Sequence, residues 1–304
     1  MGREMLGAGH TSPLGGEVGA GARGRRRARS PLPHGYRPFL LLAPLLVFLA
    51  AFYLAPLGQV ALMSVTDPKP GLANFIRVLT DPFYRAVILN TFGTALLVTA
   101  LCLALGYPLA YLIARIGGFA ATALLTLVAM SFWTSFLVRT YAWMIILGNR
   151  GPIAQSLDAL GWSPPPLLLF TRLASTIALA NILLPIMVMA VYAVMRKIDP
   201  ALTRAASGLG ASPAAAFRFV YLPLSAPGIV SGSTIVFILC VGFYVTPVLI
   251  GSPREQMIAG VIGTNIDEFL AFGEASAMAV VLLLVTGAIL AAYHRFLGLE
   301  RLWG

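Results

Sequence analysis

The most distinctive residue pattern lies between positions 199 and 225, which read DPALTRAASGLGASPAAAFRFVYLPLS. An aspartate and later a serine each stand directly before a proline, and this order is typical of a helix start. Gly208 or Gly210 can end the first helix in a left-handed turn. The stretch therefore predicts two short helices joined by a glycine turn, the second continuing to Pro223. The small side chains of the first helix leave its backbone open to close approach, which suits docking into a groove of another protein. A plain connector between two membrane helices is the alternative.

Groups that could catalyse a reaction or bind a metal are sparse. The chain has no phosphate-binding pattern G-x-x-x-x-G-K-[ST] and no nucleophile pattern G-x-S-x-G. His10, His34 and His294 are scattered, without the spacing of a metal site. We therefore expect no enzyme activity and no cofactor. ATP-driven work by this chain would need a separate ATPase.

The composition indicates that lipid is the main solvent of the chain. Of its 304 residues, 59% are hydrophobic and 11% are charged, and the mean hydropathy is +0.87. So few charges cannot cover a globular surface of this size. A membrane protein is therefore expected.

Long apolar segments predict six transmembrane helices. Each segment lacks Asp, Glu, Lys and Arg and is long enough for a helix of roughly 20 residues across the bilayer core. Helices satisfy their own backbone hydrogen bonds in lipid, and the alternation of a barrel strand is absent. No pair of acids lies within them, which argues against a proton-coupled carrier. The segments are 38–66, 86–114, 116–138, 173–195, 219–253 and 275–294.

The positive charges predict that both termini lie in the cytoplasm. In that orientation about two thirds of the 21 lysines and arginines fall on the cytoplasmic side, as the positive-inside rule requires. The net charge of +10 is thus a topology signal, and nucleic-acid binding is not needed to explain it. Residues 1–37 are rich in Gly, Arg and Pro, and we expect a disordered basic cytoplasmic tail.

Residues 38–304 resemble permease subunits of binding-protein-dependent ABC importers with the type I fold. The family's loop pattern is Glu-Ala-Ala, three residues, Gly, and about nine residues later an Ile/Val-x-Leu-Pro. This chain has RAASGLG from Arg204 to Gly210 and VYLP from Val220 to Pro223. The resemblance is strongest to the polyamine-type branch, on the stretches SFWTSFLVRTYAWMIILGNRGPI, ILLPIMVMAVYAVMRKIDP and GFYVTPVLIG.

The resemblance implies that a cytoplasmic loop, about 196–225, carries a coupling helix that docks on an ATPase subunit. Arg204 stands where the family pattern has a glutamate, so the salt bridge of that carboxylate is not expected here. We hypothesise that the Arg204 guanidinium meets an acid or carbonyl oxygens of the partner, with a solvated arginine as the alternative. The residues implied in coupling are Arg204, Ala205, Ala206, Gly210, Ser212, Phe217, Leu222 and Pro223, with Val220 beside them.

Two further groups are candidates for contact with cargo or with a binding protein. The motif GFYVTP places Gly242 and Pro247 around aromatic and hydroxyl side chains, where irregular backbone can line a cavity. Candidate path residues are Phe243, Tyr244, Thr246, Trp133 and Tyr141, the last two also suited to interfacial anchoring. Candidate docking residues for a solute-binding protein, or for a cation vestibule, are Glu255, Asp267 and Glu268, and Glu274 lies in the same loop.

We therefore predict an inner-membrane permease of an ATP-driven importer for a small organic solute, with a polyamine favoured. The implied partners are ABC ATPase subunits, a second permease (identical or homologous) and a solute-binding protein. Another solute, such as an opine-like compound, stays open. A stand-alone secondary transporter and a membrane-embedded enzyme are alternatives from other classes.

Overall fold

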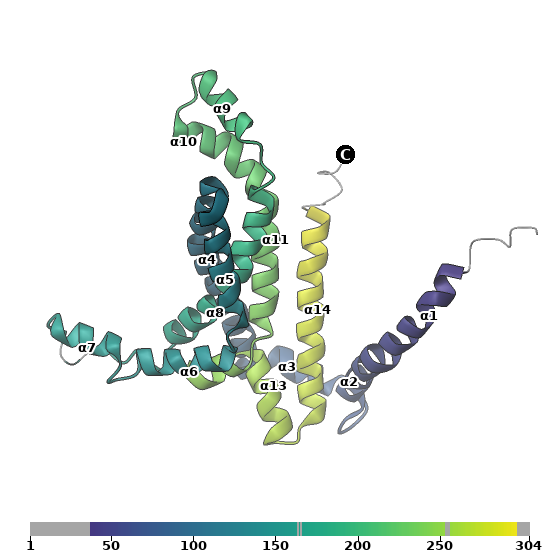
Figure 1. Ribbon diagram of the computed structural model, residues 1–304. Helices are drawn as coiled ribbons and strands as arrows, with labels where there is room; N and C mark the ends of the chain where they lie inside the picture. The colour runs from purple at the N-terminus through teal and green to yellow at the C-terminus, as the bar shows by residue number, and fades with distance from the viewer. Residues whose placement is uncertain (1–36, 163, 165, 253–255, 297–304) are drawn as a thin grey trace, which may run out of the picture. The chain divides into compact units, whose positions relative to one another are not determined.

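A computed structural model describes residues 37–162, 164, 166–252 and 256–296, and every regular element in these ranges is helical (Figure 1). The all-helical class expected from the apolar segments is thereby confirmed. The chain divides into two compact units, residues 1–52 and 53–304. Each unit is described by itself below.

The first unit contains α1 (Arg37–Leu49) and the start of a π-helical turn, η1 (Ala50–Leu54). From Leu42 to Phe52 the apolar side chains are exposed, as they are for Val47 and Phe52. Exposed aliphatic and aromatic groups along a helix suit contact with lipid tails. The predicted basic tail falls almost wholly on residues 1–36, outside the described ranges.

The second unit combines four long helices with shorter ones. The long helices are α4 (Pro82–Ile116), α8 (Arg172–Met195), α11 (Leu222–Val241) and α14 (Phe272–Phe296). The shorter helices are α2 (Ala55–Thr66), α3 (Ala73–Thr80), α5 (Gly118–Trp133), α6 (Phe136–Leu147), α7 (Pro152–Ala159), α9 (Pro200–Gly208), α10 (Pro213–Ala216), α12 (Val245–Ile250) and α13 (Ile258–Asp267), with the π-helical turn η2 (Phe217–Tyr221) between α10 and α11.

Five helical segments of the described chain are long and apolar enough to cross a membrane, and a bent pair brings the number to six. The five are Leu42–Thr66, Pro82–Ile116, Arg172–Met195, Pro213–Val241 and Phe272–Ala292. The pair is Gly118–Trp133 with Phe136–Ala159, bent by 92°. The run 116–138 is therefore not one straight helix. Thr134 is extended (ψ 131°), and the chain turns there into α6.

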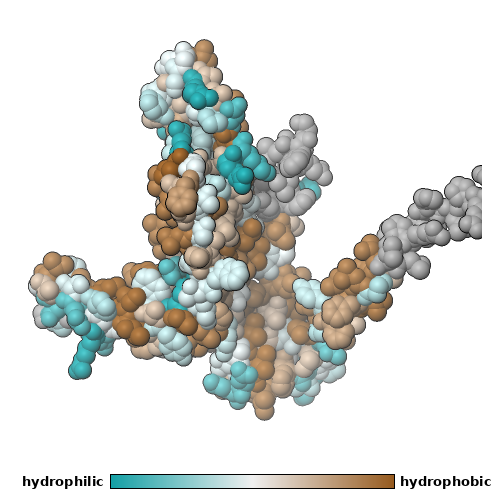
Figure 2. All heavy atoms as spheres, viewed as in Figure 1, coloured by the Kyte–Doolittle hydropathy of each residue, from teal (hydrophilic) through white to brown (hydrophobic). Residues whose placement is uncertain are grey.

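The core of the second unit lies where α4, α8 and α11 pack together. Fully buried side chains from these helices include Val98, Leu179, Met187 and Val236. By contrast, large apolar side chains on the outer faces, such as Leu96 of α4, are exposed. Figure 2 shows hydrophobic residues along the long helices and hydrophilic ones around α9, α10 and α7. This distribution fits helices with a packed interior and a lipid-facing exterior.

Two glycines let α11 approach α8 closely. A β-carbon at Gly228 would lie 3.0 Å from the Val194 Cβ and 3.2 Å from the Val191 Cα. A β-carbon at Gly232 would lie 2.9 Å from the Met187 Sδ. The spacing of the two glycines is G-x-x-x-G, a pattern that allows close contact between membrane helices. The α8–α11 interface therefore depends on the absence of side chains at these positions.

Substituting Gly228→Leu is expected to destabilise the helix bundle, because the new side chain meets the backbone of α8. Overpacking of this kind costs about 1–3 kcal/mol. The Gly287→Leu variant is the matched control, since a β-carbon at Gly287 of α14 meets nothing within 4 Å. The midpoint of thermal unfolding in detergent should fall for Gly228→Leu and stay near wild type for Gly287→Leu. Equal midpoints for both variants would contradict the close α8–α11 approach.

Candidate coupling segment and transport path

The segment around α9 has the capped helices that its sequence predicts. The Asp199 Oδ1 accepts a hydrogen bond from the Ala201 amide at 2.8 Å and begins α9. At the other end, the Ala211 amide donates to the Ala206 carbonyl and the Gly210 amide donates to the Ser207 carbonyl, both at 3.0 Å. These two bonds form a Schellman cap, and the left-handed Gly210 (φ +91°) makes it possible.

The second predicted helix start is also present. The Ser212 Oγ accepts a hydrogen bond from the Ala215 amide at 3.2 Å, and Pro213 occupies the first turn of α10. The two caps fix both ends of the connection between α9 and α10. The segment is thus a defined structure at one end of the second unit (Figure 1).

The α9 surface is open for contact with another molecule. None of its nine residues is buried, and the Arg204 and Ala205 side chains are exposed. Ala206 is partly covered. A short exposed helix with small side chains lets a partner approach the backbone closely. The prediction of a docking element at α9 is consistent with this geometry.

The sequence suggested that the second helix ends at Pro223, but in the structure the helix continues beyond this residue. The chain passes from α10 through η2 directly into α11, which continues to Val241. In η2 the Leu222 amide donates to the Phe217 carbonyl, five residues back. Pro223 lies at the junction of η2 and α11, where its missing amide interrupts the backbone hydrogen bonds without ending the helix. Pro223 is exposed and Leu222 is partly buried.

An aromatic cluster joins this segment to α4. The Phe217 ring meets the Tyr107 and Tyr111 rings edge-on, with centres 6.3 and 5.5 Å apart, and stacks on Tyr221 at 6.0 Å. The Tyr107 hydroxyl lies 3.0 Å from the Ser225 Oγ of α11. Contacts of this kind transmit displacement between packed elements. A movement of α9 and α10 would therefore reach α4 and α11 through these rings.

The motif GFYVTP forms a break between two helices. α11 ends at Val241, α12 begins at Val245, and the residues between them are not helical. Phe243 lines a cavity of about 580 Å³ together with Trp133 and Arg139, at the bend between α5 and α6. The Phe136 and Phe243 rings meet edge-on at 6.1 Å. Two of the five candidate path residues, Phe243 and Trp133, are thus brought together.

Arg139 was not among the candidate residues, although it stands in the same aromatic stretch. Its guanidinium donates to the Thr134 carbonyl at 3.0 Å and makes a long contact of 3.5 Å with the Ile182 carbonyl of α8. These contacts connect the bend between α5 and α6 to α8. A charged side chain within an apolar stretch of this kind was the available signal.

Tyr244 faces a different cavity from its neighbour Phe243. This cavity of about 240 Å³ lies between α12, α13 and the residues before α8, and Phe170, Gln256 and Thr264 also line it. The Tyr244 ring rests on Gly263, where a β-carbon would lie 3.0 Å from the ring. The cavity therefore combines two aromatic rings with amide and hydroxyl groups.

The remaining two path candidates lie elsewhere. Thr246 is buried, and its Oγ1 lies 2.9 Å from the Thr140 Oγ1, which joins α12 to α6. Tyr141 is 54% exposed on α6 and lines neither of the two cavities described above. Its position suits anchoring at a membrane surface. The structure thus divides the five candidates among two cavities, one internal bond and one exposed face.

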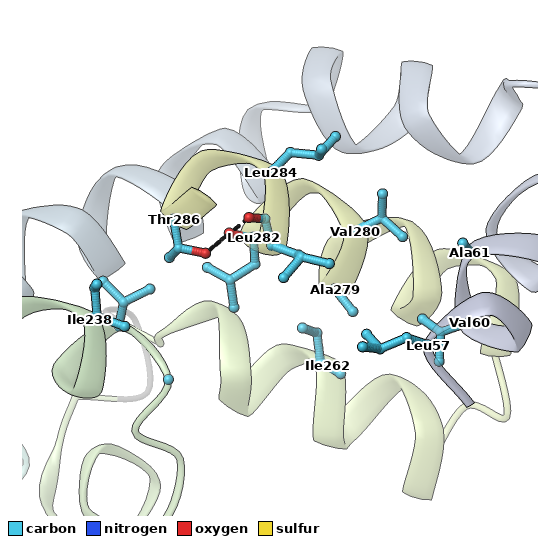
Figure 3. A pocket seen from close by; sticks show the side chains of 13 residues that line it. Leu57, Val60, Ala61, Ile238, Ile262, Ala279, Val280, Leu282, Leu284 and Thr286 are labelled. Atoms are coloured by element: carbon cyan, nitrogen blue, oxygen red, sulfur yellow. Dashed lines mark hydrogen bonds between the residues drawn. The ribbon is translucent and has the colours of Figure 1, made fainter. Parts of the chain in front are cut away.

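A third cavity, of about 570 Å³, is apolar (Figure 3). It lies between α2, α11, α13 and α14, with side chains such as Leu57, Ile238 and Ile262 around it. Its one hydroxyl side chain, Thr286, donates within its own helix to the Leu282 carbonyl at 2.7 Å. Such a lining offers no free polar group to a cationic solute.

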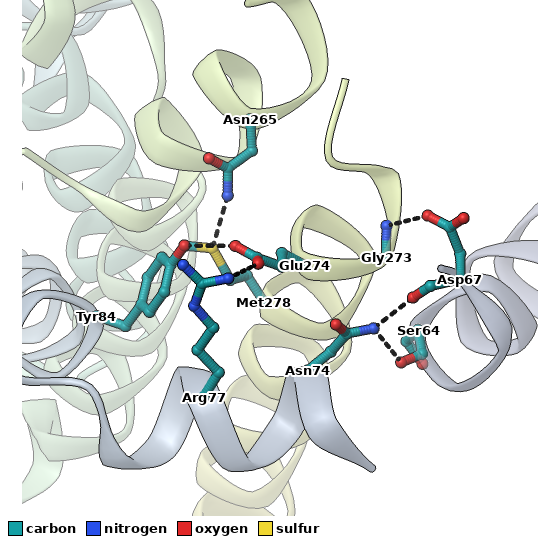
Figure 4. Close-up of polar contacts among 9 residues, drawn as sticks. All are labelled: Ser64, Asp67, Asn74, Arg77, Tyr84, Asn265, Gly273, Glu274 and Met278. Carbon is teal, nitrogen blue, oxygen red and sulfur yellow. Dashed lines mark hydrogen bonds and ion pairs between the residues drawn. The ribbon is translucent and has the colours of Figure 1, made fainter. Parts of the chain in front are cut away.

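A polar cluster lies at the end of the second unit that is opposite to α9 (Figure 4). Its side chains connect α3, α4 and α14. Glu274 of α14 pairs with Arg77 of α3 and accepts a hydrogen bond from the Tyr84 hydroxyl at 2.7 Å. The Asp67 Oδ2 accepts from the Gly273 amide at 2.9 Å. The Glu274 carboxylate is therefore engaged within the chain, where it joins α14 to α3 and α4.

The candidate docking acids differ in how the structure places them. Asp267 ends α13 and Glu268 follows it, and both side chains are exposed. Glu255 lies outside the described residues. Two of the three predicted docking residues are therefore exposed to solvent. They lie at the same end of the second unit as the polar cluster.

Comparison with known proteins places this chain in a family. Residues 106–299 match the family "Binding-protein-dependent transport system inner membrane component". The spermidine/putrescine transport system permease protein PotB of Escherichia coli (strain K12) is 35% identical over 225 residues, covering 74% of this chain and 82% of PotB. PotB of Haemophilus influenzae is 32% identical over 220 residues, covering 71% and 76%.

A solved structure supports the same fold. A chain of the bacterial alginate ABC transporter, crystallised in complex with alginate pentasaccharide-bound periplasmic protein, superposes with a TM-score of 0.67 at 17% identity. The match covers 85% of this chain and 92% of that chain. The chain therefore belongs to the inner membrane components of binding-protein-dependent transport systems. It is a multi-pass membrane permease subunit, as the sequence predicted.

Proposed function

We infer that this chain forms part of the membrane path of an ATP-driven importer for a polyamine of the spermidine or putrescine type. The observation that carries the inference is the coupling segment, in which α9 is capped at both ends and open on its surface. The relationship to PotB over 82% of that protein supports the choice of cargo.

In this importer the chain works with three kinds of partner. ATPase subunits bind at α9, a second permease completes the path, and a solute-binding protein delivers the cargo at the opposite end. The exposed Asp267 and Glu268 carboxylates suit contact with basic groups of such a binding protein. None of these partners is needed to hold α9 itself in shape, because its caps come from this chain.

The end that carries α9 faces the cytoplasm in this proposal, and both termini lie on that side. Basic residues gather there, including Arg115, Arg196, Lys197 and Arg218. Six of the described acids lie at the opposite end, namely Asp67, Asp81, Asp158, Asp267, Glu268 and Glu274. The described lysines and arginines are divided between the two ends, so the positive-inside argument for this orientation rests on the arginines of residues 1–36, which this proposal places in the cytoplasm.

ATP-driven closure of the ATPase subunits would displace α9 and α10. The aromatic cluster of Phe217, Tyr107 and Tyr111 then carries the displacement into α4, and η2 carries it into α11. The permease changes between inward-facing and outward-facing states because the ATPases contact α9 differently in their two states.

The cargo path of this chain relies on aromatic rings and neutral polar groups. Among the described residues, the acids lie outside the candidate membrane-crossing segments, except Asp158 near the end of the bent pair and Glu274 in the first turn of α14. Aromatic faces bind ammonium groups, and the cavity at Tyr244 and Phe170 offers two of them beside Gln256 and Thr264. We place the first cargo contact of this subunit there.

The experiment is uptake of radiolabelled spermidine by the complete transporter in proteoliposomes. Tyr244→Ala is expected to lower ATP-dependent uptake about fivefold to tenfold at unchanged subunit composition, because one cation–π contact is lost. Tyr141→Ala is the matched control, since its ring lines neither cavity. Unchanged uptake with Tyr244→Ala would contradict the path assignment. Uptake driven by an ion gradient without the ATPase would support the stand-alone transporter instead.

A further inference from the structure

Two arginines converge on one cavity beside the coupling helix. Arg204 of α9 and Arg115, in the last turn of α4, both line a cavity of about 320 Å³, together with Tyr111, Thr203 and Phe217. No acidic residue lines this cavity. Elsewhere in the described chain, no carboxylate pairs with either arginine within 4.0 Å, and Arg77–Glu274 is the ion pair that the described residues form. The same two arginines also line an adjoining cavity of about 300 Å³ that includes Asp199, but Asp199 forms no ion pair within 4.0 Å with either of them. Neither guanidinium is therefore paired with a carboxylate of this chain.

The Arg115 side chain is held in place by aromatic rings. Its guanidinium carbon lies 4.8 Å from the centre of the Tyr111 ring and 5.5 Å from that of Tyr221. These two rings meet edge-on at 5.0 Å, so they form a rigid support. A guanidinium stacked on rings keeps its N–H edges free to bind an oxygen acceptor. Less conformational entropy is then lost when an anion binds.

The hydroxyl groups of the cavity do not replace the arginines as donors. The Thr203 Oγ1 donates to the Pro200 carbonyl at 3.0 Å, and the Ser207 Oγ donates to the Thr203 carbonyl at 3.1 Å. The two guanidinium groups are therefore the charged donors that can meet an incoming anion. A carboxylate accepts hydrogen bonds from guanidinium groups in a bidentate geometry.

We propose that the cavity between Arg115 and Arg204 binds a carboxylate side chain of the ATPase subunit. This inference rests on the proposed function, because it places the ATPase at α9. Arg204 is the immediate neighbour of Ala205, and both are exposed on α9. A partner that covers Ala205 therefore also contacts Arg204. The pair of arginines then also connects the ATPase directly to α4. The contact has the opposite charge to the one that a glutamate at position 204 would make.

The experiment uses Arg204→Lys in the purified complex of permease and ATPase. A carbodiimide activates carboxylates, and the introduced amine forms an amide only with a carboxylate in direct contact. We expect a cross-link from position 204 to an Asp or Glu of the ATPase, located by mass spectrometry. Arg218→Lys is the matched control, because Arg218 is exposed on η2 and lies over Phe219, away from the cavity. A co-purifying ATPase without a cross-link at position 204 would overturn the proposal.

A second variant distinguishes the carboxylate from a lipid headgroup. The double variant Arg115→Gln with Arg204→Gln should bind the ATPase about tenfold more weakly in phosphatidylcholine nanodiscs, where no anionic lipid is present. A loss that occurs only with phosphatidylglycerol in the nanodisc would assign the site to lipid and overturn the proposal. If the wild-type chain binds no ATPase at all, the proposed function fails and this inference falls with it.

Discussion

Replacing Ala205→Glu together with Gly210→Asp is expected to abolish ATP-dependent uptake by the complete transporter. Ala205 is exposed on α9, so a glutamate there is compatible with the helix but places a charge in the contact with the ATPase. Gly210 has a φ of +91°, a conformation that disfavours any other residue and that the Schellman cap requires. An unpaired charge buried at an interface costs about 3 kcal/mol or more, which is about a hundredfold in affinity.

The control for this variant is Ala159→Glu, which places the same charge on an exposed position of α7. Uptake and ATPase binding should stay at wild-type levels with Ala159→Glu. Both readouts should fall together with the double variant, while the yield of folded permease is unchanged. Full uptake by the double variant would show that α9 does not contact the ATPase.

The second large effect is expected for Phe217→Ala, which should separate ATPase binding from transport. The Phe217 ring contacts Tyr107, Tyr111 and Tyr221, and each aromatic pair contributes about 0.5–1.5 kcal/mol. Removing the ring leaves α9 exposed and capped but disconnects it from α4. We expect the ATPase to bind normally, and the amount of solute moved per ATP hydrolysed to fall about tenfold or more.

Phe219→Ala is the matched control within the same π-helical turn. Its ring is 73% exposed and faces Arg218 at 5.8 Å instead of the aromatic cluster. ATP hydrolysis and uptake are measured in parallel in proteoliposomes for both variants. If Phe217→Ala keeps the wild-type ratio of uptake to hydrolysis, the aromatic cluster does not carry the displacement.

The sequence was sufficient to predict the elements that depend on local chemistry. Apolar length located the long helices, and the caps at Asp199 and Ser212 are present as their proline neighbours indicated. The left-handed glycine is Gly210, one of the two positions considered. Each of these features is decided by a few residues next to one another in the chain, which is why they could be read without a structure.

Features that depend on contacts between distant segments could not be predicted in this way. Arg77 and Glu274 are 197 residues apart, and nothing in either neighbourhood indicates their pairing. The bend at Thr134 interrupts an apolar run that has no proline or charge at that point. The helix was expected to end at Pro223, but it continues through η2 into α11, because packing of this segment against α4 and α8 is not visible in the local sequence.

A further signal in the sequence, besides the charge of Arg139, is a pair of glycines. Gly228 and Gly232 have the spacing of a close helix–helix contact, and they lie at the α8–α11 interface. The break in GFYVTP was recognised, but the two neighbouring rings face different cavities. Backbone direction within a break depends on packing against α6 and α13, so the sequence alone did not separate Phe243 from Tyr244.

The most direct measurement is purification of this chain from its own membranes in a mild detergent, with every co-purifying subunit identified by mass spectrometry. We predict an ABC ATPase and a second permease in the wild-type sample, and loss of the ATPase from the Ala205→Glu, Gly210→Asp sample. A well-folded wild-type chain that co-purifies with no ATPase would contradict the coupling role of α9.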